Sequence, residues 1–246
     1  PLNDDFTGFI FKIQANMNPN HRDRLAFMRI SSSIFERGMQ VIHSKTGKPI
    51  RLAQPQQFMA QERTIVEEAY AGDIIGVFDP GQFRISDTIA VSSEQFSFDP
   101  IPVFPPEHFA RVAPENSMKR KQFLKGITQL ALEGAIQVYK QPDIGTETFV
   151  IGVVGALQFD VLEHRLRNEY GVAIRQTPLN YQKARWIRPD ATGRMPDAQK
   201  LSLTSTTLLV LDKNESPVLL FESDWAITWA LERNKDLVLE SIHLED

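Results

Sequence analysis

Two groups of basic residues are the side chains of this sequence whose types and spacing suit binding chemistry. The first group lies on two turn-rich segments between predicted strands and consists of His21, Arg22, Arg24, Lys45, Lys48 and Arg51. The second group lies at the start of a predicted helix and consists of Lys119, Arg120, Lys121 and Lys125. Most surface charge belongs to a solvated rim, but cations gathered on turns also favour an anionic partner. These residues are therefore candidate contacts to such a partner.

The helix that begins near Met118 strengthens this interpretation for the second group. Cations in the first turn of a helix oppose the helix dipole, at a cost of about 0.3–1 kcal/mol each when they are exposed. Glu115, just before the helix, offsets only part of that cost. A locally unfavourable choice of residues often indicates a functional site. Anion binding and a merely solvated helix face both remain open for this group.

No constellation in the sequence predicts catalysis. The histidines never fall at metal-ligand spacing, and there are no cysteines. His21-Arg22-Asp23 lacks the glycine-rich loop and downstream Asn of a kinase, and Gly152–Gly155 lacks the Gly-Lys-Ser/Thr of a phosphate-binding loop. The sequence therefore predicts no catalytic residue, no metal ligand and no cofactor site in this chain.

The charge distribution limits where an anionic partner could bind. The chain carries a net charge of -4, and the segment Asp212–Asp246 alone carries -6, so the preceding residues carry +2. This balance argues against a general nucleic-acid coat and against DNA as a partner. The absence of cysteine suits a reducing compartment, and no apolar run reaches membrane-spanning length. We expect a cytoplasmic protein with no membrane partner.

Alternating apolar residues and closely spaced turns predict an all-β barrel domain over residues 1–97. The expected strands are about half a dozen, with Gly and Pro turns between them: Phe9–Gln14, Leu25–Ile30, Gly38–His43, Arg63–Glu68, Ile74–Val77 and Ser86–Ile89. The proline-rich segment Phe96–Pro106 predicts a stiff linker that is packed against its neighbours. We place the domain boundary in it.

Residues 98–246 predict an α+β domain of ferredoxin-like type with a C-terminal extension. The expected order is strand, helix, two strands, helix, strand, over Phe109–Ala113, Met118–Gly134, Gln137–Lys140, Thr148–Val154, Leu157–Tyr170 and Val172–Thr177. Gly171 sits where a left-handed helix cap belongs. The extension reads as an exposed loop, a hairpin, a helix capped by Ser223 or Asp224, and a last strand, over Arg188–Gln199, Thr206–Phe221, Trp225–Arg233 and Leu237–Ile242.

Several segments resemble one family. The run Gln61–Val77, which contains Val66-Glu67-Glu68-Ala69-Tyr70-Ala71-Gly72-Asp73, resembles the end of the second domain of translational GTPases. Phe6–Ile30, with Lys12-Ile13-Gln14-Ala15-Asn16-Met17 and His21-Arg22-Asp23-Arg24, resembles the barrel domain of bacterial class II peptide-chain release factors. Lys121–Gly126, Glu133–Val138, Gly155–Val161 and Ala184–Trp186 are similar to the third domain of that family. Ser31-Ser32-Ser33 departs from its usual Ser-Gly turn, and the likeness weakens after Trp186.

The resemblance implies a fold of the translation-factor second-domain type and a function on the ribosome. It implies that the parent protein is a GTPase that promotes departure of the class I release factor after peptide release. The GTP-binding domain would precede this chain and would hold GTP or GDP and Mg. This chain would then contact ribosomal RNA and ribosomal proteins, and would not itself be an enzyme. The alternative is a free-standing RNA- or protein-binding barrel module that shares only the fold.

Overall fold

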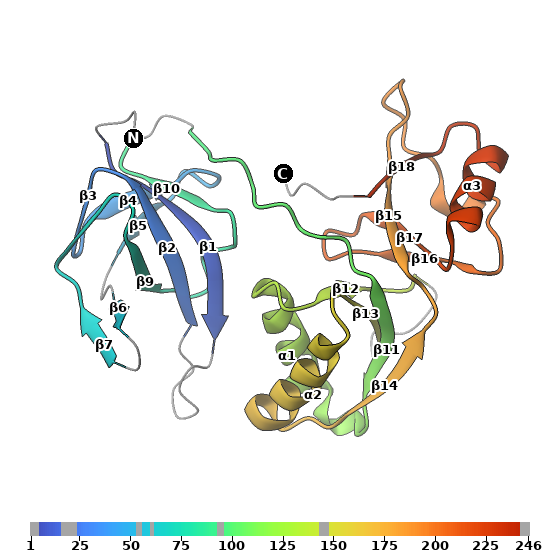
Figure 1. The fold of residues 1–246 in the computed structure, drawn as a ribbon, viewed down its shortest axis with the longest axis horizontal. Helices are drawn as coiled ribbons and strands as arrows, with labels where there is room; N and C mark the ends of the chain where they lie inside the picture. The colour runs from blue at the N-terminus through green and yellow to red at the C-terminus, as the bar shows by residue number, and fades with distance from the viewer. Residues whose placement is uncertain are drawn as a thin grey trace. The chain divides into compact units, whose positions relative to one another are not determined.

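The computed structural model describes residues 5–15, 24–52, 56–59, 62–92, 96–142 and 148–241. The chain divides into two compact units, which we call unit 1 and unit 2, built on residues 1–101 and 102–245. The division falls in the predicted linker (Figure 1). The boundary between residues 97 and 98 stays a prediction.

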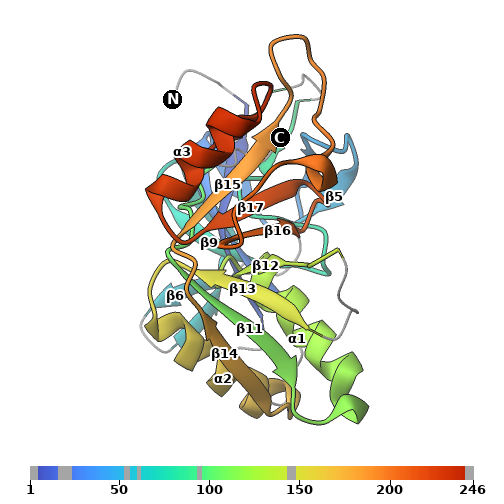
Figure 2. The ribbon, with the colours of Figure 1, turned by 90° about the vertical axis from the view of Figure 1, so that its right-hand side faces the viewer.

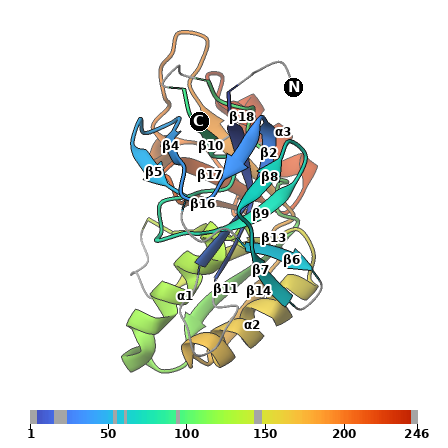
Figure 3. The same ribbon diagram turned by 90° about the vertical axis from the view of Figure 1, so that its left-hand side faces the viewer.

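Unit 1 is an all-β, barrel-like fold, as predicted. Eight antiparallel strands form one sheet in the order β5-β4-β10-β1-β2-β9-β6-β7, and β3 pairs with β8. Figure 3 labels most of these strands. The strands are β1 Thr7–Ala15, β2 Arg24–Ser32, β3 Ile34–Glu36, β4 Gln40–His43, β5 Pro49–Arg51, β6 Gln56–Met59, β7 Glu62–Ile65, β8 Glu68–Tyr70, β9 Ile74–Phe78 and β10 Thr88–Ala90. The single strand predicted over Arg63–Glu68 is wrong, because Val66 and Glu67 separate β7 from β8. The short strands β3, β5 and β6 escaped prediction.

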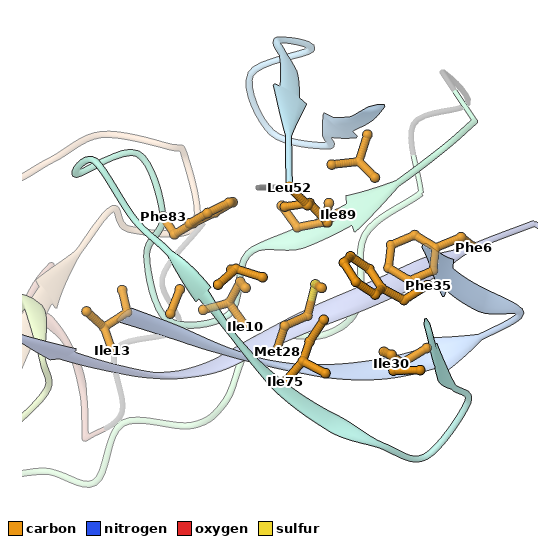
Figure 4. Packing of buried hydrophobic residues seen from close by; sticks show 14 residues of the cluster. Phe6, Ile10, Ile13, Met28, Ile30, Phe35, Leu52, Ile75, Phe83 and Ile89 are labelled. Carbon is orange, nitrogen blue, oxygen red and sulfur yellow. The ribbon is translucent and has the colours of Figure 1, made fainter. Parts of the chain in front are cut away.

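The inward side chains of these strands form one apolar core. Ile10, Met28, Ile75 and Ile89 come from four neighbouring strands and are fully buried (Figure 4). Strand β1 passes close to β2, since a Cβ on Gly8 would lie 2.4 Å from Sδ of Met28. The period-2 pattern of the sequence therefore corresponds to an inside and an outside face.

The turn after β2 contains Ser33, where the sequence departs from the expected Ser-Gly pattern. Ser33 adopts a left-handed conformation, with φ of 62°. Such a conformation costs a residue with a Cβ about 1–2 kcal/mol. The short β3–β8 pair that follows places Phe35 in the core, where it is fully buried and tilts against Phe6. Packing of Phe35 in the core therefore anchors the strand that follows this turn.

The first half of unit 2 has the predicted ferredoxin-like order. Its sheet runs β12-β13-β11-β14, and all the pairings are antiparallel. Gly171 caps the second helix with φ of 66°, as predicted. The first helix ends at Leu132 rather than at Gly134, because Gly134 turns left-handed with φ of 72°. The elements are β11 His108–Pro114, α1 Arg120–Leu132, β12 Gln137–Tyr139, β13 Phe149–Val153, α2 Leu157–Tyr170 and β14 Ile174–Leu179.

The rest of unit 2 is a second four-stranded sheet with one helix. The sheet order is β16-β17-β15-β18, and its elements are β15 Lys183–Arg188, β16 Thr207–Leu211, β17 Pro217–Phe221, α3 Asp224–Arg233 and β18 Val238–Glu240. The predicted hairpin, helix and last strand are present, and Ser223 caps α3 by accepting from the amide of Ala226. Strand β15, at the centre of this sheet, escaped prediction. No helix among the described residues is both long enough and apolar enough to cross a membrane.

Unit 2 is built in four layers (Figure 2). Helices α1 and α2 cover one face of the ferredoxin-like sheet, and the second sheet covers the other. Phe109 and Tyr139 of the first sheet share a core with Trp186 and Leu220 of the second. Burial raises the pKa of the Tyr139 phenol far above its ordinary value. Helix α3 covers the outer face of the second sheet through Ala226 and other residues. The extension is therefore part of the packed core of unit 2.

Candidate functional site

Three of the predicted contact residues lie together on the β4–β5 hairpin. Lys45 and Lys48 lie in its turn, Arg51 ends β5, and all three side chains are exposed. The turn is built on His43, whose carbonyl accepts from the amide of Gly47 at 2.8 Å and whose amide donates to the carbonyl of Lys48 at 3.0 Å. Among the described residues, none forms an ion pair with these three cations. We call Lys45, Lys48 and Arg51 the basic hairpin.

Of the three other predicted members of the first group, the structure describes Arg24. His21 and Arg22 lie outside the described residues. Arg24 is largely buried, with Nε 2.6 Å from Oδ2 of Asp79 and Nη2 donating to the carbonyl of Phe83 at 2.6 Å. The guanidinium is already paired within unit 1, so Arg24 is a poor candidate for binding an external anion.

The second group lies on a well-formed helix start. Lys119 belongs to a 3₁₀ turn, Ser117–Lys119, whose first amides are capped by Asn116. Lys121 and Lys125 are exposed one turn apart on α1, whereas Arg120 is half-buried. Helix α1 has no acidic residue in its first turn. Within the described part of the chain, Lys119, Lys121 and Lys125 have no ion-pair partner. The predicted conflict with the helix dipole is therefore present in the structure.

This conflict gives a stability prediction. Replacing Lys119 and Lys121 together with Glu should raise the free energy of unfolding of unit 2 by about 1 kcal/mol, because anions are favoured at a helix start. Lys125→Glu is the matched control, and we expect it to change stability by less than about 0.5 kcal/mol because it lies beyond the first turn. Urea unfolding followed by tryptophan fluorescence measures both, since Trp186, Trp225 and Trp229 all lie in unit 2. A less stable double variant would mean that the two lysines make stabilising contacts in the folded chain.

The outer face of unit 1 carries aromatic and basic residues that belong to neither of the two predicted basic groups. Lys12 Nζ lies 5.5 Å from the ring centre of Phe27, and Arg29 pairs across the strands with Ile74. Phe78, at the end of β9, is 51% exposed. The sequence of β1 and β2 contains a signal for these residues. The outward positions of the alternating pattern carry aromatic and basic residues, where small polar residues are usual.

Unit 2 contains a groove of about 850 Å³ beside β14 and β15. Its lining includes Phe159, Pro178, Tyr181 and Arg185. Burial raises the pKa of the Tyr181 phenol, Glu222 adds to the increase and Arg111 opposes it. Among the described residues that line the groove, Glu107 alone carries a carboxylate, and Lys183 is paired with Asp224. We assign it no chemistry.

The described residues form no group of three or more metal-ligating side chains. His43 is engaged with Asp87 in the core of unit 1, while His108 and His164 are exposed and far apart in the sequence. His21 and His243 lie outside the described residues. Within the segment that resembles translational GTPases, the Tyr70 hydroxyl donates to Glu68. This hydrogen bond raises the pKa of Tyr70. These contacts are structural.

Both units match known families. Residues 5–92 match the family of elongation factor G domain 2, and residues 98–231 match the family described as class II release factor RF3, C-terminal domain. A crystal structure of a protein from Thermus thermophilus superimposes with a TM-score of 0.55 at 17% identity, and the match covers 85% of this chain and 31% of that one. At that identity the likeness concerns the fold alone.

Similar sequences extend over both units. Proteins named peptide chain release factor 3 are 51% identical in Symbiobacterium thermophilum, 49% in Listeria welshimeri and 47% in Streptococcus thermophilus. These matches cover 96–98% of this chain and 44–45% of the relatives. The chain thus spans less than half the length of the curated relatives that it matches. Together with the family match over unit 2, they show that the chain belongs to the class II release factor RF3 family.

Proposed function

We propose that this chain is the ribosome-docking part of a GTP-dependent translation termination factor. In that role the longer protein promotes dissociation of class I release factors from the ribosome after peptide release. The observation that supports this most is the sequence identity to release factor 3 proteins, which runs through both units. GTP or GDP with Mg would be held by the preceding GTP-binding domain, and the protein would act in the cytoplasm.

The ribosome contact on unit 1 would be the basic hairpin. Its three cations are exposed and lack intramolecular partners among the described residues, although the chain as a whole is acidic. Phosphate groups of ribosomal RNA would supply the negative charges that pair with these cations. A second contact would lie at the start of α1, where helix amides and the side chains of Lys119 and Lys121 both favour an anion.

Pelleting of the 246-residue chain with ribosomes across a salt series tests the proposal. Replacing Lys45 and Lys48 with Glu should weaken binding by about tenfold or more near 0.1 M salt. Each lost phosphate contact should also reduce the slope of log affinity against log salt by about 0.7–0.9. The matched control is the double change Lys200→Glu and Lys235→Glu, which alters the net charge equally and involves residues of neither cluster. Binding that is flat in salt, or equal in the two double variants, would contradict the hairpin contact.

The same pair of variants placed in the full-length factor separates docking from the rest of the function. The hairpin variant should slow departure of the class I release factor, whereas the control variant should not. GTP affinity measured off the ribosome should be the same in both, because the nucleotide belongs to another domain. Normal recycling by a hairpin variant that no longer pellets with ribosomes would contradict a docking role for this chain.

A further inference from the structure

A short segment of unit 1, the turn Arg84–Thr88 between β9 and β10, makes hydrogen bonds in two directions. Two backbone hydrogen bonds join it to β1. The amide of Ser86 donates to the carbonyl of Ile10 at 2.8 Å, and the amide of Ile10 donates to the carbonyl of Asp87 at 2.9 Å. Ser86 adopts a left-handed φ of 74°, which costs a residue with a Cβ energy unless its surroundings require it. We call residues 84–88 the connecting turn.

In one direction the connecting turn holds the basic hairpin. Nε2 of His43 lies 2.8 Å from Oδ2 of Asp87, and the side chains are only 6% and 3% exposed. Because a carboxylate only accepts, the ring nitrogen is the donor. The amide of Ser44 also donates to the carbonyl of Thr88 at 3.0 Å. The backbone of His43 is hydrogen-bonded to Gly47 and Lys48 in the turn of the basic hairpin. The buried His43 ring therefore anchors the segment that carries Lys45 and Lys48.

In the other direction the same turn holds the linker. Oγ of Ser86 accepts from the amide of Ile101 at 2.9 Å, and Oγ1 of Thr88 accepts from the amide of Phe98 at 2.9 Å. Both hydroxyls belong to buried residues. The ring of Phe98 also meets the ring of Phe9 edge-on, with centres 5.7 Å apart. The linker is thus packed onto unit 1, as its aromatic residues predict.

The two sets of bonds interleave along the chain. Asp87 holds the hairpin, and its two neighbours, Ser86 and Thr88, hold the linker. Buried hydrogen bonds are costly to leave unmade, which favours a common movement of these groups over a movement of one alone. These contacts form a hydrogen-bonded connection from the hairpin to the segment that leads into unit 2, separate from the apolar core.

We infer that His43 and Asp87 are positioning residues that couple the basic hairpin to the linker between the two units. The pair fixes where Lys45 and Lys48 stand, and through Ser86 and Thr88 it fixes the first residues of the linker. The coupling concerns unit 1 alone. Its use in ribosome docking rests on the function proposed above, with RNA phosphates as the ligands of the hairpin.

Amide exchange in the 246-residue chain, followed by NMR, tests the coupling. His43→Leu should accelerate exchange of the Phe98 and Ile101 amides by about tenfold, although neither amide touches His43. His43→Gln, whose side-chain amide can still donate to Asp87, should keep the acceleration to about threefold or less. Glu67→Gln, which alters an exposed ion pair of the same unit, is the control and should leave both amides unchanged.

The core amides of β1 and β2 distinguish coupling from unfolding. If His43→Leu also accelerates exchange of these core amides, Asp87→Asn replaces it as the test variant. It keeps the size of the side chain while weakening the hydrogen bonds that Oδ2 of Asp87 accepts from His43 and from the amide of Arg84. Linker amides that stay within about twofold of the wild type, in a variant whose core amides remain protected, would overturn the inference.

Ribosome pelleting separates this inference from the proposed function. His43→Leu should weaken binding by about threefold to tenfold, and His43→Gln should restore it, whereas a purely structural loss would not be rescued. If the linker amides respond but neither His43→Leu nor the Lys45 and Lys48 double variant changes ribosome affinity, the coupling stands and the hairpin contact fails. If the double variant weakens binding and the linker amides do not respond, the contact stands and the coupling fails.

Discussion

Replacing Asp79 with Ala is expected to lower the free energy of unfolding of unit 1 by about 3–5 kcal/mol. The Asp79 side chain is fully buried and lies against the Arg24 guanidinium, which is only 13% exposed. Its other oxygen, Oδ1, accepts from the amides of Gly81, Gln82 and Phe83 at 2.7–3.1 Å. The substitution leaves a buried cation unpaired and three amides without their acceptor. Loss of one partner of a buried pair is among the costliest single changes.

Two further variants divide this effect. Asp79→Asn keeps the acceptor for the three amides and removes the charge, so we expect about half of the loss. Glu67→Ala breaks the Arg37–Glu67 pair, which is similarly short, at 2.7 Å against 2.6 Å, but exposed, and should cost less than about 1 kcal/mol. If Glu67→Ala proved as costly as Asp79→Ala, burial would not be the reason for the effect.

Exchange of the buried amides of β1 and β2 measures the opening of unit 1 in these variants. The chain supplies its own internal control, because unit 1 contains no tryptophan and the fluorescence of the three tryptophans reports unit 2. Asp79→Ala should leave the fluorescence transition in urea unchanged. A shifted transition would show that the damage reaches the core of unit 2.

Replacing Gly126 with Val is expected to destabilise unit 2 by about 2–3 kcal/mol. A Cβ at this position would lie 2.4 Å from Cδ2 of Leu166 and 3.1 Å from the ring of Tyr170. Leu166 is fully buried on α2, so its side chain would have to shift within the core that it shares with Phe123 and Ile127. Gly126 is therefore the residue that allows α1 and α2 to approach closely, in spite of the usual cost of glycine within a helix. Urea unfolding followed by tryptophan fluorescence measures the loss.

A double-mutant cycle shows whether the helix contact is the cause. Leu166→Ala alone should cost about 2–5 kcal/mol through the cavity that it leaves. Combined with Gly126→Val, it should cost at least about 1 kcal/mol less than the sum of the two, because the new side chain occupies part of the cavity. Gly155→Ala is the matched control, since a Cβ there meets nothing within 4 Å and its φ is not left-handed. Additive effects would exclude Leu166 as the obstacle.

Local patterns in the sequence were sufficient to predict the elements whose signals lie within a few residues. The period-3.6 apolar faces of α1 and α2, the capping residues Gly171 and Ser223, and the β-branched run of β13 all depend on neighbours in the chain. The order of elements along unit 2 then leaves the ferredoxin-like arrangement as the natural packing of two helices on one sheet. The likeness of the Phe6–Ile30 and Gln61–Val77 segments to translation factors led to the family that the comparisons show.

Strand β15 illustrates what such patterns miss. Lys183–Arg188 alternates charged and apolar residues over a short run, and its partners β17 and β18 come from much later in the chain. Whether a short run becomes a central strand depends on those partners. The same holds for β3, β5 and β6, which are three or four residues long and have a place only in the assembled sheet.

The candidate site likewise has some features that local sequence predicts and others that only contacts between distant residues decide. The types and spacing of its residues select Lys45, Lys48, Arg51, Lys119, Lys121 and Lys125 as cations, because turn residues and a helix start are local features. Only the tertiary structure assigns Arg24 to Asp79, ties His43 to Asp87 and buries part of Arg120, because each depends on groups that are distant in sequence and adjacent in space. The sequence by itself determined which charges are present and that they lie on turns and a helix start. The fold decided which of them remain exposed for a partner, because burial and pairing depend on contacts between distant parts of the chain.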